Sequence, residues 1–371
     1  MTMYYHSPLL DRASWMLWHN RAMRLPFDPH FPHKDEDHAL ASMLPPVNQG
    51  PVFIMGLHRS GTTFLYDLLR RTLPLAELEL YHLFYFRRLL HNARYDLEKR
   101  DRATLNRLFQ ALGIRDRSLD AIHISDATVE EYGWLLGTVD GTPHVTENNV
   151  AILDLLCRKL AALRPEAAMV ILKNPWDIGH AHTLLHHFPE ARFVYIHRNP
   201  VAILRSEVEV LHTLLTGRQP FHALLTDFLL EPRGRLAAHL AHGLWGLARL
   251  LHETLPRAIT APLFRRHAAH QIRRDLLGYR HDLQQLPGER VFELGYEELI
   301  GDPVLAVGRI ARFLDLEPLT QVQEAPPVKP RSKVAELTAF EQRFLQHLAD
   351  MELLASKVLP FPAQPPPESS S

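Results

Sequence analysis

The sequence predicts an α/β protein in which helices cover both faces of a central parallel sheet. Short apolar runs typical of buried strands occur at 52–55, 169–172, 192–197 and 291–294, and longer segments with helical periodicity separate them. The first run leads through a turn rich in Gly, Ser and Thr directly into a helix. That alternation of strands and helices is typical of a three-layer α/β/α fold.

The turn after the first strand has the composition of an anion-binding loop. Gly56 and Gly61 let the backbone curl so that its N–H groups point inward, and the helix expected from Thr62 adds its positive end. The glycine spacing is P-loop-like, but Thr62 and Thr63 stand where nucleotide kinases carry Lys and then Ser or Thr. Arg59 replaces the missing lysine, where it would face a transferred group. The loop therefore predicts a phosphate or sulfate site.

Composition limits the classes of function. The chain has 371 residues, of which 46% are hydrophobic and 22% charged, as in an ordinary globular enzyme. The formal net charge of −1 argues against a nucleic-acid partner, and the single cysteine, Cys157, excludes a disulfide framework. The sequence shows neither a cleavable signal nor an apolar run of about 20 residues. We therefore expect a cytoplasmic protein without a transmembrane segment.

The chain is expected to form one main domain, at about 46–355. An N-terminal arm, 1–45, precedes it, and a Pro- and Ser-rich tail, 356–371, follows it. Within the domain we expect a helical insertion at about 75–165 and a helical cover at about 207–285. Part of this cover could close the acceptor pocket or touch a membrane surface, although the interspersed charges favour packed helices.

Two further strands are each followed by a cation. Lys173 follows the run 169–172 and Arg198 follows 192–197, and ligands of open parallel sheets gather at such strand ends. Lys173 would lie beside the loop, where it could stabilise charge on an oxygen whose bond breaks. Asn199 and Pro200 begin the next helix, and its apolar stripe points away from Ser206. Arg198 and Ser206 are therefore available for a second anion.

The loop, Lys173, and Arg198 with Ser206 eight residues later together resemble the bacterial-type sulfotransferases that use 3′-phosphoadenosine 5′-phosphosulfate (PAPS). The resemblance covers about residues 50–210 and resumes near the carboxyl end. It implies transfer of a sulfuryl group from PAPS to an acceptor hydroxyl, with no metal. The acceptor stays open among small molecules, lipids and glycans, and the oligomeric state is not predicted.

The resemblance also implies which residues bind PAPS. Those expected at the 5′-phosphosulfate are His58, Arg59, Ser60, Gly61, Thr62 and Thr63. Arg198 and Ser206 are expected to hold the 3′-phosphate, and a basic loop would bring Arg331 and Ser332 onto the donor. Arg59 and Lys173 would stabilise charge on the leaving oxygen.

The general base is less well defined. Cytosolic members carry a histidine directly after Lys-Thr, where this chain has Asn174 and Pro175. Members with a Lys-x-Pro pattern use a glutamate shortly after the phosphosulfate loop, and Glu79 occupies roughly that position. Glu130 and His123 are alternatives, because bacterial members carry a similar His and Glu-Glu stretch near the acceptor.

Part of that stretch also has a structural explanation. Thr128 is placed as the N-cap of the next helix, and Glu131 stands at its capping-box position. On this interpretation both residues begin a helix and have no part in the reaction.

Two other classes of function remain open. A P-loop kinase or NTPase would bind ATP and Mg²⁺, but it would leave Arg198 and Ser206 without a role. A binding protein without activity is possible if the absent histidine base means lost chemistry. His182 and His186 lie one helical turn apart, as metal ligands can, but no third ligand stands at a suitable spacing, so we expect solvated side chains.

Overall fold

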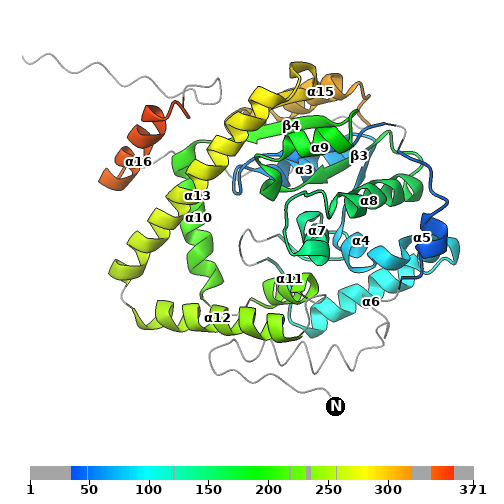
Figure 1. The fold of residues 1–371 in the computed structure, drawn as a ribbon, viewed down its shortest axis with the longest axis horizontal. Coiled ribbons are helices and arrows are strands. Elements are labelled where there is room, and N and C mark those ends of the chain that lie inside the picture. The colour runs from blue at the N-terminus through cyan, green and yellow to red at the C-terminus, as the bar shows by residue number, and fades with distance from the viewer. Residues whose placement is uncertain are drawn as a thin grey trace, which may run out of the picture.

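Within the described part of the chain, a five-stranded parallel sheet forms the centre of the protein (Figure 1). The computed structural model describes residues 35–319 and 336–354, except 48, 118, 120, 121, 217, 218, 231–234 and 256. The strand order is β2-β3-β1-β4-β5. The strands are β1 Val52–Met55, β2 Leu75–Glu77, β3 Met169–Lys173, β4 Arg192–His197 and β5 Val291–Gly295.

Helices cover both faces of the sheet, so the predicted three-layer α/β/α fold is confirmed. One layer contains α3 Thr62–Thr72, α14 Tyr296–Gly301 and α15 Pro303–Leu314, and the other contains α7 Gly133–Asp140, α8 Val150–Leu163 and α9 Ala181–His187. In β1, Val52 and Ile54 pack against the first layer, while Phe53 and Met55 pack against the second. A strand buried on both faces has a continuous apolar sequence, which is why β1 was recognisable.

The strand register brings three strand ends to one place. β1 lies between β3 and β4, with Ile54 opposite both Lys173 and Val194. The loop after β1 therefore emerges between the ends of β3 and β4, as ligand sites in open parallel sheets require. After β4, the Asn199 side chain accepts a hydrogen bond from the Val201 N–H at 2.9 Å, and Pro200 is the first helical residue, as predicted.

The remaining helices form two groups and two terminal pieces. Between β2 and β3 lie α4 Leu80–Phe84, α5 Leu89–Arg94 and α6 Glu98–Ala111, followed by α7 and α8; between β4 and β5 lie α10 Pro200–Leu214, α11 Pro220–Leu230, α12 Arg235–Thr254 and α13 Arg257–Gln285. Short 3₁₀ turns occur at Phe86–Arg88, Pro175–Asp177 and Gly288–Arg290. The terminal pieces are α2 His38–Ala41 and α16 Ala339–Asp350.

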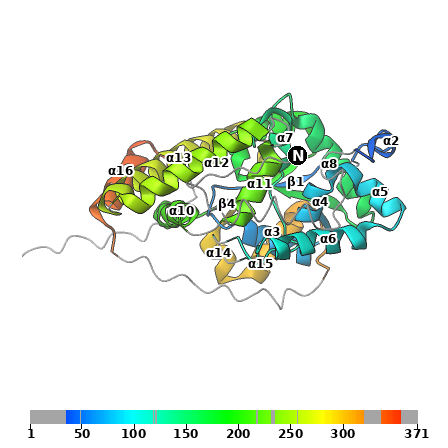
Figure 2. The ribbon, with the colours of Figure 1, turned by 90° about the horizontal axis from the view of Figure 1, so that it is seen from below.

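These positions can be compared with the expected boundaries. The helical insertion expected at about 75–165 begins with the edge strand β2, and the cover expected at about 207–285 consists of long helices. Figures 1 and 2 show α12 and α13 extending to one side of the sheet, with α16 beside α13. None of the described helices combines the length and apolar composition needed to cross a membrane. Most of the predicted N-terminal arm and the whole predicted tail lie outside the described residues.

A buried ion pair fastens the segment before β1 to the helical layer. The Lys159 ammonium of α8 lies 2.7 Å from a carboxylate oxygen of Asp37 and donates to the Phe86 carbonyl at 2.6 Å. The Asp37 carboxylate also accepts from the backbone N–H groups of Leu90 and His91. Burial lowers the pKa of Lys159, and Asp37 opposes this shift. Each buried charge is therefore stabilised by the other.

We expect Lys159→Met to lower the free energy of unfolding by about 3–5 kcal/mol, because it leaves the Asp37 carboxylate buried without its counter-ion. The matched control is Arg158→Met on the same helix, which removes a partly exposed ion pair with Asp154 and should cost less than about 1 kcal/mol. Urea denaturation monitored by circular dichroism measures both values. Equal losses in the two variants would contradict the role of the buried pair.

Candidate active site

The loop between β1 and α3 is tightly curled. Ser60 donates to the Leu57 carbonyl from its backbone N–H at 3.1 Å and from its hydroxyl at 2.7 Å. Gly61 has a φ of 104°, and a Cβ there would lie 2.5 Å from the Tyr296 ring. Arg59 also has a positive φ, 66°, which is uncommon for a residue with a side chain. Such backbone strain is typical of functional sites.

Arg59, Arg198 and Ser206 come together at the end of β4. The Arg198 guanidinium donates to the Arg59 carbonyl at 3.0 Å and lies over the Tyr296 ring, 4.2 Å from its centre. The Arg59 Nε donates to the Ser206 hydroxyl on α10 at 3.0 Å. The expected neighbours Arg198 and Ser206 thus lie in one group, and the Arg59 side chain reaches toward them. This arrangement concentrates two positive charges beside the curled loop.

Lys173 lies on the other side of the same loop. Its ammonium is fully buried and donates to the Thr63 hydroxyl and to a Glu131 carboxylate oxygen, each at 2.9 Å. Thr63 belongs to the first turn of α3, so the position of Lys173 follows from the pairing of β1 with β3. The structure thus brings Lys173 beside the loop, as the strand order indicated.

Glu131 is the residue that sequence reasoning assigned wrongly. Burial would raise the pKa of its carboxyl, but Lys173 and His58 outweigh this effect and lower it, so the group is ionised at neutral pH. The predicted N-cap and capping box are not formed, because α7 begins at Gly133, and Tyr132 is its N-cap residue without a side-chain cap. The Thr128 hydroxyl instead accepts from the Ser125 N–H at 2.8 Å.

The physical reason is tertiary pairing. Val129 forms an antiparallel bridge with Glu79, and the Glu130 N–H donates to the Leu78 carbonyl at 3.2 Å. The Tyr132 N–H donates to the Lys173 carbonyl at 3.4 Å. The segment before α7 is therefore held extended beside the ends of β2 and β3, where local helix signals do not apply.

Glu79 lies in an ion-pair network next to this segment. Its carboxylate is 2.8 Å from the Arg102 guanidinium and 3.9 Å from that of Arg70, and its backbone N–H donates to the His82 ring at 3.1 Å. Burial raises the pKa of Glu79, and Arg102 is the main opposing charge. Glu79 is thus close to the strand ends but bound by structural partners.

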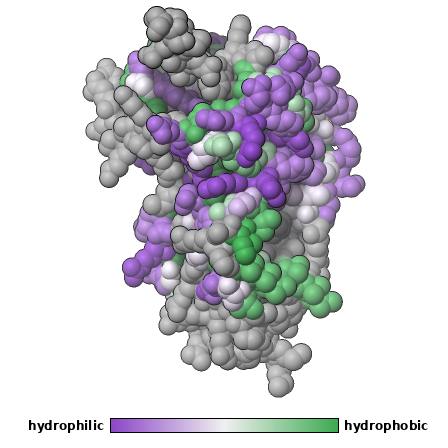
Figure 3. Space-filling model, turned by 90° about the vertical axis from the view of Figure 1, so that its left-hand side faces the viewer, coloured by the Kyte–Doolittle hydropathy of each residue, from purple (hydrophilic) through white to green (hydrophobic). Residues whose placement is uncertain are grey.

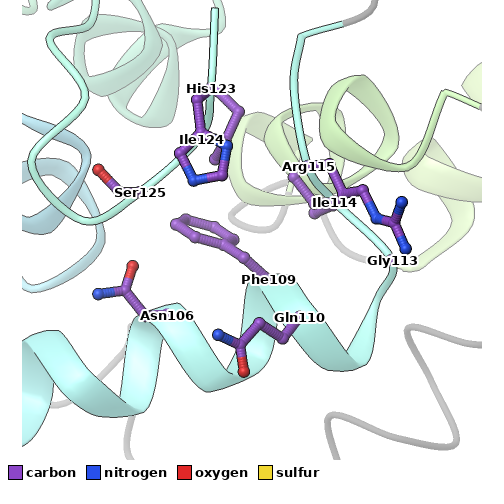
Figure 4. A pocket seen from close by; sticks show the side chains of 9 residues that line it. All are labelled: Asn106, Phe109, Gln110, Gly113, Ile114, Arg115, His123, Ile124 and Ser125. Atoms are coloured by element: carbon purple, nitrogen blue, oxygen red, sulfur yellow. The ribbon is translucent and has the colours of Figure 1, made fainter.

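Glu130 and His123 lie in different surroundings. The Glu130 carboxylate is buried 2.9 Å from the Arg117 guanidinium, and burial raises its pKa. His123 lines a cavity of about 480 Å³ between α6 and the neighbouring loops, where its ring faces Phe109 and Asn106 (Figure 4). Neither residue makes a hydrogen bond or ion pair with Lys173 in the structure.

The remaining points concern the basic loop, a metal site and a residue that the sequence did not reveal. Arg331 and Ser332 lie outside the described residues. Among the residues that the structure describes, no group of three His, Cys, Asp or Glu side chains could hold a metal ion. Sequence reasoning missed Tyr296, whose ring lies beneath the Arg198 guanidinium and fills the space beside Gly61. Its position directly after β5 was the available signal.

The three-layer fold with a glycine-rich loop before α3 defines a P-loop-like α/β protein. A sequence model of the sulfotransferase family matches residues 51–251, more than half of the chain, and the protein belongs to this family. The comparison with curated proteins finds no match.

Several solved structures are similar to this chain. The sulfotransferase STF9 from Mycobacterium avium is 18% identical, the aligned parts cover 94% of this chain and 84% of that one, and the TM-score is 0.48. STF1 from Mycobacterium tuberculosis H37Rv is 16% identical, with coverage of 85% and 75% and a TM-score of 0.46. The sulfotransferase domain from the curacin biosynthetic pathway is 16% identical, with coverage of 81% and 98% and a TM-score of 0.39.

The Lys173–Glu131 pair makes a prediction about pH. In the wild type the lowered pKa of Glu131 contributes stability above the ordinary glutamate pKa, and this contribution disappears as the pH falls through the folded-state value. In Lys173→Met the main charge that lowers the Glu131 pKa is gone, so burial should raise that pKa. As the pH falls, protonation of Glu131 should remove the unbalanced buried charge and so reduce the loss of stability in the variant. The stability difference between the two proteins should therefore shrink from pH 7 toward about pH 4.

Urea denaturation at a series of pH values measures this difference, because other acid-sensitive groups cancel between the two proteins. Lys173→Met combined with Glu131→Gln is the control, and its difference from Glu131→Gln alone should change much less with pH. A wild-type to Lys173→Met difference that stays constant across the range would contradict the coupling.

Proposed function

We propose that the protein transfers a sulfuryl group from PAPS to the hydroxyl of an acceptor. The observation that carries the proposal is the pair of cationic groups on either side of one curled loop. Arg198 with Arg59 lies at the end of β4, and Lys173 lies at the end of β3. PAPS carries two anionic groups, the 5′-phosphosulfate and the 3′-phosphate. Membership of the sulfotransferase family supports the same reaction.

The residues present fit this donor. Gly61 has a φ of 104°, which lets the loop curl tightly, and α3 begins directly after it, so its first N–H groups would face an anion held there. Backbone N–H groups from Gly61 to Thr63 would hold the 5′-phosphosulfate, because the Ser60 N–H already donates to the Leu57 carbonyl. Arg198 and Ser206 would hold the 3′-phosphate, because a guanidinium and a hydroxyl are suited to phosphate oxygens. A kinase or NTPase acting on ATP would leave this second site without a ligand.

Lys173 and Glu131 would carry the chemistry. PAPS supplies a sulfuryl group whose departure leaves negative charge on a phosphate oxygen. The Lys173 ammonium is desolvated, and a positive charge in such surroundings stabilises a developing anion more strongly than it would in water. The Thr63 hydroxyl, which accepts from Lys173, helps to aim the ammonium at the loop.

For the base we prefer Glu131 to Glu79. A general base must be ionised and close to the reacting group, and the Glu131 carboxylate lies 2.9 Å from the Lys173 ammonium with a lowered pKa. The Glu79 carboxylate is instead bound to Arg102 at 2.8 Å, and it makes no hydrogen bond or ion pair with Lys173. Glu79 therefore remains an alternative, followed by Glu130 and His123.

Glutamine substitutions distinguish these bases. We expect Glu131→Gln to lower kcat by roughly a hundredfold or more while the donor still binds, because a base contributes about 10²–10⁴-fold. The fall in kcat at low pH that reports an essential carboxylate should also disappear. Glu79→Gln and Glu130→Gln are the matched controls and should retain most of the activity. Normal turnover in Glu131→Gln with a sharp loss in Glu79→Gln would assign the base to Glu79.

The reaction itself is tested with donor labelled in the sulfuryl group. Purified protein is incubated with labelled PAPS and a panel of phenols, alcohols, glycans and lipids, and label is followed into product. We expect transfer to at least one hydroxyl class. Transfer from labelled ATP with Mg²⁺ instead would identify a kinase. Tight binding of adenosine 3′,5′-bisphosphate without any transfer would favour a non-catalytic binding protein.

A further inference from the structure

The outer face of α12 carries a continuous apolar stripe that nothing in the described structure covers. Its side chains recur every three or four residues along the helix and at the residue after its end, and they are between 38% and 71% exposed; they are Leu236, Leu240, Leu244, Leu247, Leu251 and Leu255. The opposite face of the helix is fixed to the protein. The Trp245 indole donates to the Leu214 carbonyl at 2.9 Å, and His252 is buried against Phe264. The leucines therefore cannot turn inward.

The apolar surface continues onto the first turns of α13. Ile259 and Leu263 are about half exposed and lie one helical turn apart. The next residues on the same side of α13, Arg266 and His270, are exposed and polar. Figure 3 views this end of the protein, and it shows apolar side chains gathered in the lower half beneath a hydrophilic area.

The charge around this surface is one-sided. Between residues 235 and 270 the sequence has five arginines and one acidic residue, Glu253, whereas the whole chain has a net charge of −1. Glu253 is already paired with Arg249 at 3.0 Å. The apolar stripe therefore lies in a locally positive field that the rest of the protein balances elsewhere.

A positively charged pocket opens beside the apolar surface, between α13 and α16. The pocket is about 500 Å³, and its polar lining consists of Arg266, Arg273, Arg343, His270 and His347. None of the described residues that line it carries a carboxylate. Arg273 makes hydrogen bonds to the His270 and His347 rings, both at 3.2 Å, and neither ring has a negative charge that could balance the guanidinium. The pocket is therefore suited to an anion.

We propose that this end of the protein, formed by α12, the start of α13 and α16, docks on an anionic lipid surface. The leucines would enter the boundary between headgroups and acyl chains, as amphipathic helices do when they lie on a membrane. The pocket would take an anionic phosphate headgroup, for which arginines are the preferred ligands. The inference does not depend on the identity of the sulfuryl donor or acceptor.

The charge distribution favours lipid over a second copy of the chain. In a two-fold dimer through α12 the same positive surroundings would face each other, and like charges would repel. An anionic membrane instead complements both features, because it offers an apolar interior to the leucines and negative headgroups to the arginines.

Vesicle co-sedimentation of the full chain tests the proposal. We expect binding to vesicles of phosphatidylcholine mixed with phosphatidylglycerol, little binding to phosphatidylcholine alone, and weaker binding as salt is raised. Arg266→Ala combined with Arg343→Ala should weaken binding roughly thirtyfold. Leu240→Asp combined with Leu244→Asp should abolish it. Both pairs of positions are on the surface, and circular dichroism checks that the variants fold.

Matched controls are Arg94→Ala on α5 and Leu305→Asp on α15, which change exposed residues elsewhere on the protein and should leave vesicle binding unchanged. Several results would overturn the proposal. Wild-type protein that binds neither kind of vesicle is one. Another is a wild-type dimer, by sedimentation velocity, that Leu240→Asp with Leu244→Asp converts to a monomer without any vesicle binding. A third is vesicle binding that Arg266→Ala combined with Arg343→Ala leaves unchanged, which would exclude the pocket as a headgroup site.

Discussion

The structure of the site depends on one buried lysine. The Lys173 ammonium has no exposure to solvent, so its charge must be balanced within the protein. The Glu131 carboxylate balances the charge, and the Thr63 hydroxyl accepts a second hydrogen bond, at 2.9 Å each. These contacts require that β3 lie beside β1, that α3 begin where it does, and that the segment before α7 run extended. A single buried charge thus links three segments that are distant in sequence.

Local sequence information was sufficient for the framework. The buried strands, the glycine-rich turn and the start of α10 could be predicted because each depends on residues within about ten positions of one another, such as Asn199 with Val201. The position of Lys173 beside the loop also followed from the sequence, because the carboxyl ends of neighbouring parallel strands share one edge.

The partners within the site depend on contacts that the sequence does not display. Glu131 had a convincing local explanation as a capping residue, but the bridge between Val129 and Glu79 holds its segment extended. Glu79 was preferred as the base from its interval after the loop. Its ion pair with Arg102 joins the residue before α4 to a residue of α6, so no spacing rule could reveal it. The same holds for Arg198 and Tyr296, which approach only when β4 and β5 pair.

Arg198 and Ser206 are proposed to form the site for the 3′-phosphate of the donor. Calorimetric titration with adenosine 3′,5′-bisphosphate and with adenosine 5′-phosphate, which lacks only that group, tests it most directly in the wild type and in Arg198→Ala. We expect the wild type to prefer the bisphosphate by about 2–4 kcal/mol and the variant to lose most of this preference. Equal affinity of the wild type for the two nucleotides, or an unchanged preference in Arg198→Ala, would contradict it.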